Sequence, residues 1–465
     1  MSESTVEEFR SIGHQLIDWV AAYLADPEQY PVLSSTRPGE LMDALPAKGP
    51  DDPEPLKWIV ADFEKLILPG ITHWNHPGFM AYFATSSPPP GVLAELLAAA
   101  LNANGILWKT SPAITELELV ALNWIRQWMD LPPTYFGIIF DTASTSTLHA
   151  LAAARQQAAP EIRTTGRSGR PLILYCSEHA HSSVDKAAIA LGIGQDNIRK
   201  APADDEFQMR ADELEAAVLR DKAAGAHPFC IVATVGTTST TSIDPVPEAA
   251  RIARENGLWL HVDAAYAGAA AIVPELREKF AAMEQADSIV FNPHKWLFTP
   301  VDCSVLYTSK PEILRAAFSL VPEYLTTPAD PRMINLMDYG IPLGRRFRAL
   351  KLWFVLRAFG RQGLSAVIRN QIQIAQELAA WIRASAGFEL MAPVPFSVVC
   401  FRYLGTDQQN EELLAQINAE SGCYLSHTVL RGRYVIRIAI GNLGTKREHI
   451  ERLWEQIQQI AGRLA

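Results

Sequence analysis

Short apolar segments alternate with amphipathic helical ones between residues 137 and 307, and this alternation restricts the chain to few folds. We expect strands at 137–140, 172–176, 229–234, 258–262, 288–291 and 304–307. Between most of them we expect helices at 147–157, 183–191, 211–223 and 246–255. Repeated strand–helix–strand units build a mostly parallel sheet with helices on both faces. Ligands of such sheets bind beyond the carboxyl ends of the strands.

The pattern changes on both sides of this region. Residues 1–88 are predicted to form a helical and wrapping segment, 89–350 a large α/β domain, and 351–465 a smaller α+β domain. The leading segment carries apolar residues at helical spacing, namely Phe9, Ile12, Leu16, Trp19 and Tyr23. A stripe this wide needs a surface to cover it, and a second subunit would provide one.

Composition excludes several partners. The net charge of −10 disfavours nucleic acid and anionic membranes, both of which favour basic surfaces. The chain lacks an uncharged apolar run of about 18 residues, and its first residues, MSESTVEEF, are acidic where a signal peptide is basic. Its five cysteines lack zinc-site or redox-site spacing. We therefore expect a cytoplasmic protein with a small-molecule ligand.

Polar clusters follow the predicted strands. The cluster DTASTST at 141–147 opens a helix, where small hydroxyl residues suit a phosphate group, although an ordinary helix N-cap has the same composition. A second cluster holds His179 and His181 without Cys or Glu at metal-ligand spacing, which argues against a metal site. These histidines are either structural or catalytic.

Two charged residues also end apolar strands. Asp263 either caps the next helix or faces a cationic ring nitrogen, because an unpaired buried carboxylate is costly. Burial would lower the pKa of Lys295 and leave an amine able to form a Schiff base. One predicted helix and one strand separate the two, so a single crossover brings both to one crevice. A phosphate site, a carboxylate and a lysine together are what pyridoxal 5′-phosphate requires.

Specific motifs then connect the chain to a family. It resembles the group II pyridoxal-phosphate decarboxylases, nearest the aromatic L-amino-acid branch, whose members have the fold of type I pyridoxal-phosphate enzymes. The motifs that carry this resemblance are HWNHPGFMAYF at 73–83, SPAITELE at 111–118, HAHSSVDKA, ATVGTTSTTSID at 233–244, HVDAAYAG, NPHKW and IPLGRRFRALK at 341–351.

The resemblance implies a role for each site residue. Lys295 would bind the cofactor aldehyde, Asp263 would pair with the protonated pyridine nitrogen, and His181 would stack on the ring. Ala265 would pack against the other ring face, and Thr238 would lie near the substrate carboxylate or a cofactor oxygen. The residues implied to surround the phosphate are Thr142, Ala143, Ser144, Asn292 and His294.

Further implied roles concern catalysis and assembly. Tyr324 stands where relatives place a mobile-loop tyrosine that protonates the product carbon, whereas relatives that make aldehydes usually carry Phe there. The family's members are homodimers with active sites at the interface. The substrate would contact Trp74, Phe79, Tyr82 and Thr85 of one chain. Asn104 and Ile106 would face the neighbouring subunit's substrate, and Gly344 would leave room for a bulky or indole ring.

We therefore predict decarboxylation of an aromatic L-amino acid, namely tyrosine, tryptophan, dopa or phenylalanine. Alternatives are an aromatic aldehyde synthase and a decarboxylase of glutamate, aspartate or histidine. Arg345, Arg346 and Arg348 would favour acidic substrates if they lay in the pocket, but we expect them to be structural. A non-enzymatic relative is disfavoured because Lys295 and Asp263 are both present.

Overall fold

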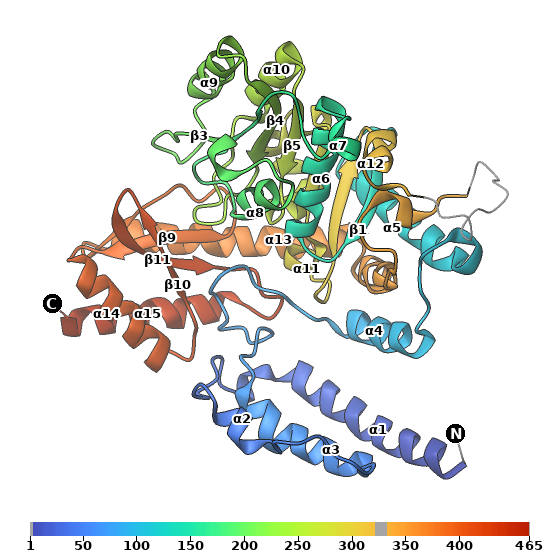
Figure 1. Cartoon of the computed structure of the whole chain (residues 1–465). Helices are drawn as coiled ribbons and strands as arrows, with labels where there is room; N and C mark the ends of the chain where they lie inside the picture. Colours follow the sequence, from blue (N-terminus) through green and yellow to red (C-terminus); the bar gives the residue numbers. More distant parts are fainter. Residues whose placement is uncertain (1–2, 321–332, 465) are drawn as a thin grey trace.

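The computed structural model describes residues 3–320 and 333–464. Figure 1 shows an N-terminal helical layer, a large α/β body and a small C-terminal domain beside that body. No helix in these two ranges is both long and apolar enough to cross a membrane. The predicted α/β fold is confirmed, and the larger sheet forms its centre.

Seven strands form the central sheet in the order β1-β7-β6-β5-β4-β2-β3. The strands are β1 (Phe136–Phe140), β2 (Leu172–Ser177), β3 (Ile198–Ala201), β4 (His227–Thr234), β5 (Trp259–Asp263), β6 (Ser288–Phe291) and β7 (Ser304–Thr308). β7 pairs antiparallel with both β1 and β6, and the other neighbouring strands of the sheet pair in parallel. The six predicted strands are confirmed. β3 escaped prediction because this edge strand carries Arg199 and Lys200 and buries only Ala201.

Helices cover both faces of this sheet. They include α5 (Pro112–Trp128), α6 (Ala143–Ala158), α7 (Ile162–Thr165), α8 (Ser183–Ala190), α9 (Ala211–Ala223), α10 (Val246–Asn256) and α12 (Pro311–Phe318). One predicted helix is wrong. Between β5 and β6 the chain forms 3₁₀ turns at Ala267–Ile272, Pro274–Phe280 and Met283–Gln285. The parallel crossover itself is present, because β5 and β6 pair in parallel.

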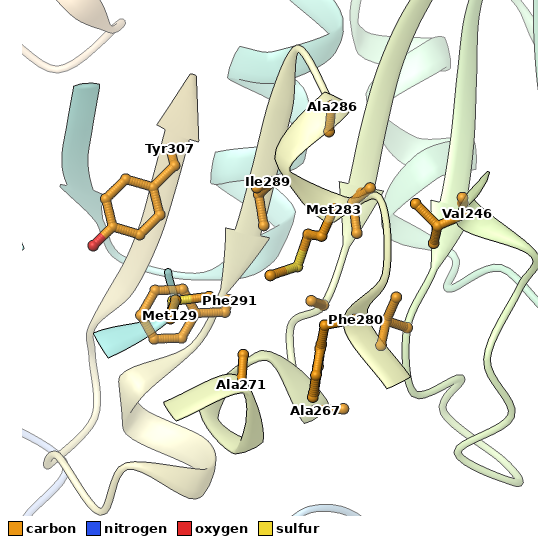
Figure 2. Packing of buried hydrophobic residues seen from close by; sticks show 14 of the residues in the cluster. Met129, Val246, Ala267, Ala271, Phe280, Met283, Ala286, Ile289, Phe291 and Tyr307 are labelled. Carbon is orange, nitrogen blue, oxygen red and sulfur yellow. The ribbon is translucent and has the colours of Figure 1, made fainter. Parts of the chain in front are cut away.

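Both faces of the sheet are buried. On one face, shown in Figure 2, Phe291 and Tyr307 stack with ring centroids 6.1 Å apart, and Met129 and Phe280 belong to the same cluster. Residues that alternate with these point to the other face, where Trp259 packs with side chains of α6 and α8. Burial on both sides explains why the strands are continuously apolar.

The small domain pairs four antiparallel strands with two helices. Its elements are β8 (Phe388–Leu390), β9 (Val398–Tyr403), α14 (Asp407–Glu420), β10 (Ser426–Leu430), β11 (Arg433–Ala439) and α15 (Arg447–Leu464). Helix α13 (Arg348–Ala384) connects it to the body and is broken at Gly360, where φ is 61°. β8 and β10 were not predicted, since one has three residues and the other is a polar edge strand.

The N-terminal layer extends from the body, with α4 (Pro89–Leu101) between them (Figure 1). It contains α1 (Glu3–Ala25), α2 (Glu40–Ala44) and α3 (Leu56–Asp62). Tyr23 anchors α1, because its hydroxyl lies 3.0 Å from Nδ1 of His73. By contrast, the Phe9 side chain is 63% exposed. Phe9 and Leu16 of the predicted stripe therefore face outward, whereas Ile12 is buried.

Candidate active site

Two adjoining cavities open at the carboxyl ends of β4, β5 and β6. The inner cavity is about 200 Å³ and the outer about 410 Å³, and both include Lys295 in their walls. The structure brings together in the inner cavity ten residues predicted from sequence: Thr142, Ala143, Ser144, His181, Thr238, Asp263, Ala265, Asn292, His294 and Lys295.

Strand pairing places Asp263 and Lys295 at one edge. Asp263 is the last residue of β5 and pairs with Val290 of β6. After β6, the backbone N–H of Asn292 donates to the Ala265 carbonyl at 2.9 Å, and a short helix, α11 (Pro293–Trp296), carries the lysine. Asp263 is buried, and its Oδ1 accepts the backbone N–H of Ala265 at 3.0 Å.

The Lys295 amine is shifted towards its neutral form. Burial lowers the pKa of Lys295 from its ordinary value of 10.5 to about 8, against the opposing effect of Asp263. Its Nζ lies 5.0 Å from the ring centroid of Phe83, and Arg437 lowers the pKa further. A partly neutral amine in a cavity is a suitable nucleophile for an aldehyde.

Hydrogen bonds fix the tautomers of two histidines. The backbone N–H of Ser183 donates to Nδ1 of His181 at 3.1 Å, and that of Cys303 donates to Nδ1 of His294 at 2.9 Å. A nitrogen that accepts a hydrogen bond carries no proton, so both neutral rings hold their proton on Nε2. Burial lowers the pKa of His294 to about 4 and, despite the nearby Asp263, also lowers the pKa of His181.

The inner cavity also presents unsatisfied polar groups. Helix α6 begins at Ala143, with Thr142 extended as its N-cap, so its free N–H groups lie at the cavity wall. Within the described ranges, Oγ1 of Thr234 and Oδ1 of Asn292 are buried without a hydrogen-bond partner. Buried polar atoms usually have partners. A polar ligand with an anionic group at α6 would fit these residues.

The outer cavity is lined by both aromatic and polar residues. Trp74, Tyr82, Phe83 and Thr85 line it. The Trp74 ring stacks on Phe79 with centroids 4.2 Å apart. Ser426, His427 and Thr428 of β10 also contribute to its lining.

Sequence reasoning missed Arg437, a buried residue of β11 that lines the outer cavity. Its NH1 donates to the Tyr82 carbonyl at 2.7 Å, and its Nε donates to the Ser239 carbonyl at 3.1 Å. Within the described ranges its NH2 has no partner. A charged residue inside the apolar strand YVIRIAI was the available signal, since buried arginine is rare without a role.

Four predicted residues that the structure describes do not line this cavity. Phe79 is fully buried beneath Trp74 and does not line it, which corrects the expected direct contact. Asn104 and Gly344 lie together on the surface, where Asn104 Oδ1 accepts the backbone N–H of Arg345 at 2.8 Å. Ile106, half-buried, follows in the same segment. Tyr324 lies outside the described residues.

The three arginines at 345–348 serve structure, as predicted. Arg345 makes a buried ion pair with Glu118 at 2.6 Å, Arg346 pairs with Glu95 and Arg348 with Asp302. None of the three lines the outer cavity described above. Their charge is therefore no argument for an acidic substrate.

Comparisons with known proteins agree with this geometry. Residues 38–404 match the model of the pyridoxal-dependent decarboxylase conserved domain. The chain belongs to this family. It is 43% identical to the aromatic-L-amino-acid decarboxylase of Bos taurus over 98% of this chain and 96% of the relative. It is 40% identical to the phenylacetaldehyde synthase of Arabidopsis thaliana, with the same coverage.

A solved relative shows the same fold. The Catharanthus roseus tryptophan decarboxylase, crystallised with L-tryptophan, has a TM-score of 0.93 and 37% identity, covering 99% of each chain. The protein is thus a pyridoxal-phosphate-dependent carboxy-lyase, and the inner cavity offers the groups that its cofactor needs.

The pKa of Lys295 makes a testable prediction for this decarboxylase. A protonated amine cannot attack an aldehyde, so covalent capture of pyridoxal phosphate by the apoenzyme should rise with pH and level off above about 8. Stopped-flow absorbance measures this rate. Lys295→Ala is the control that should form no covalent band. A rate still rising towards pH 10 would show an unshifted lysine.

Proposed function

We propose that the enzyme converts an aromatic L-amino acid, such as tyrosine, tryptophan, dopa or phenylalanine, to its amine and CO₂. The carrying observation is the outer cavity, which Trp74, Tyr82, Lys295 and Arg437 line together. Aromatic rings stack well against Trp74 and Tyr82. The relatives named above act on or bind aromatic amino acids, which supports this choice.

The proposed roles follow from the chemistry of each residue. When bound, pyridoxal phosphate supplies the electron sink for the bond to the departing carboxylate. Lys295 would attach the cofactor, and the buried Asp263 would keep its pyridine nitrogen protonated. His181 and Ala265 would hold its ring. The N-terminus of α6, with Thr142, Ala143, Ser144, Asn292 and His294, would receive the phosphate.

Arg437 is proposed to hold the substrate carboxylate before it leaves. Two of its nitrogens are fixed by backbone carbonyls, so the third is pre-oriented. Thr238 lies on the same wall. Among the described residues of the outer cavity, Arg437 is the one guanidinium, so a second carboxylate would lack a matched partner. This geometry disfavours glutamate and aspartate.

Aldehyde synthesis is the second candidate, because the chain is also 40% identical to a phenylacetaldehyde synthase. We propose that Tyr324 decides between the two reactions. A phenol Oη near the product carbon delivers a proton as general acid, and this is commonly worth about 10² to 10⁴ in rate. Without it, the slower reaction with dioxygen competes.

A substrate panel tests this proposal. Purified enzyme should release amine and CO₂ from at least one of tyrosine, tryptophan, dopa and phenylalanine faster than from glutamate, with little aldehyde or peroxide. Chromatography and a peroxide assay measure the products. Tyr324→Phe should raise the aldehyde share and lower amine formation. Faster turnover of glutamate would overturn the aromatic assignment, and an unchanged product ratio in Tyr324→Phe would remove Tyr324 from its role.

We also propose a homodimer, because apolar side chains are exposed together on the N-terminal layer and α4. They are Val6, Phe9, Leu16 and Ile17 of α1, Leu56, Trp58 and Ile59 of α3, and Leu93, Leu96, Leu97 and Leu101 of α4. Contiguous exposed apolar surface marks an association site. Asn104, Ile106 and Gly344 border the end of α4, where a partner's cavity would meet them.

Five buried free thiols support a cytoplasmic location.

Two leucines of similar exposure provide a test of the proposed dimer. Leu96 on α4 is 51% exposed and Leu219 on α9 is 54% exposed. Leu96→Glu should dissociate the dimer and lower activity, because it places a charge in the proposed interface, whereas Leu219→Glu should change neither. Sedimentation velocity and turnover report the two effects. A fully active monomer of the unmodified chain would contradict the proposal.

A further inference from the structure

Two buried amide side chains connect the turn that carries Lys295 to the segment that carries Trp74. Trp296, the next residue after the lysine, donates its indole N–H to Oε1 of Gln371 at 2.6 Å. Nε2 of Gln371 donates to the Asn442 carbonyl at 2.8 Å. Nδ2 of Asn442 then donates to the Trp74 carbonyl at 2.8 Å.

This connection is shielded from water. Trp296 is fully buried, and Gln371 and Asn442 are each 1% exposed. Both polar ends of the Gln371 amide are used, so neither can be replaced by solvent without a rearrangement. Hydrogen bonds in such surroundings are strong, and an unpaired partner is costly.

A second path returns from Trp296 to the lysine through stacked rings. Trp296 stacks on Tyr266 with centroids 4.6 Å apart, and Tyr266 stacks on Phe83 at 3.9 Å. The amine of Lys295 lies over that same Phe83 ring. The position of the Trp296 indole therefore affects both the lysine turn and the ring beneath the amine.

Gln371 also stands where three parts of the chain meet. It belongs to α13 beyond the break at Gly360, where Ile374 and Leu378 pack into the small-domain core. Asn442 follows β11, which carries Arg437. The amide of Gln371 thus joins the small domain to the lysine turn and, through Asn442, to the wall of the outer cavity.

We propose that Gln371 is a positioning residue for the reaction. It fixes the Lys295 turn relative to Trp74 and the small domain. Its hydrogen bonds therefore affect the turnover number of the holoenzyme. This inference rests on the proposed roles of Lys295 and Trp74. Small misplacements of reacting groups can cost about 10²-fold in rate, which is the scale on which such a residue acts.

Gln371→Leu tests the inference in the holoenzyme, since it keeps the approximate size and removes both hydrogen bonds. The turnover number per bound cofactor should fall by about tenfold or more. Gln376→Leu is the matched control. Gln376 lies on the same helix and donates to the Val394 carbonyl within the small domain. It should leave turnover per bound cofactor within about twofold, although it also removes a hydrogen bond made by a side-chain amide of this helix.

Trp296→Phe provides a second test if Gln371→Leu does not fold. It keeps a stacking ring but removes the donor, and should lower turnover in the same way. The double variant should have a turnover only slightly lower than that of either single variant, because both changes remove the same hydrogen bond between Trp296 and Gln371. A purely structural role would lower the melting temperature and leave turnover per bound cofactor unchanged, which would overturn the inference. Absence of decarboxylation by the unmodified enzyme would instead refute the proposed function.

Discussion

The parallel pairing of β5 with β6 is the constraint on which the site depends. It places Asp263 and the Lys295 turn at one sheet edge, and the hydrogen bond from Asn292 to Ala265 fixes the two strand ends together. Because this edge is buried, the pKa of Lys295 falls to about 8 while the Asp263 carboxylate remains nearby. Backbone geometry, rather than flexible side chains, therefore brings this lysine and this carboxylate together.

The remaining parts complete the cavity around this pair. The small domain contributes Arg437, whose guanidinium donates hydrogen bonds to two backbone carbonyls. The N-terminal segment contributes Trp74 and Tyr82, and Arg437 holds the carbonyl of Tyr82, whose φ is 51°. Three parts of the chain thus meet at one amine. Hydrogen bonds between them, including those of Gln371, determine how accurately they meet.

The sequence predicted the sheet because its strands are buried on both faces and are therefore continuously apolar. Asp263 and Lys295 were recognisable because charged residues interrupt such strands at their ends. Edge strands β3 and β10 escaped because their polar residues resemble loops. The prediction that the Phe79 side chain lines the cavity was wrong. The segment HWNHPGFMAYF is irregular, so no helical or strand periodicity indicates which aromatic ring faces the cavity. The hydrogen bonds of Arg437 could be recognised only in the tertiary structure, since its partners are carbonyls far along the chain.

Chemical mapping of the cofactor attachment tests the central claim most directly. Borohydride reduction of the holoenzyme, followed by proteolysis and mass spectrometry, should place one pyridoxyl group on the Lys295 peptide, and Lys295→Ala should carry none. Lys351, which is also buried but lies beside Glu95, should remain unmodified. An adduct on Lys351 or on any other lysine, or a visible absorbance band that survives in Lys295→Ala, would contradict the account.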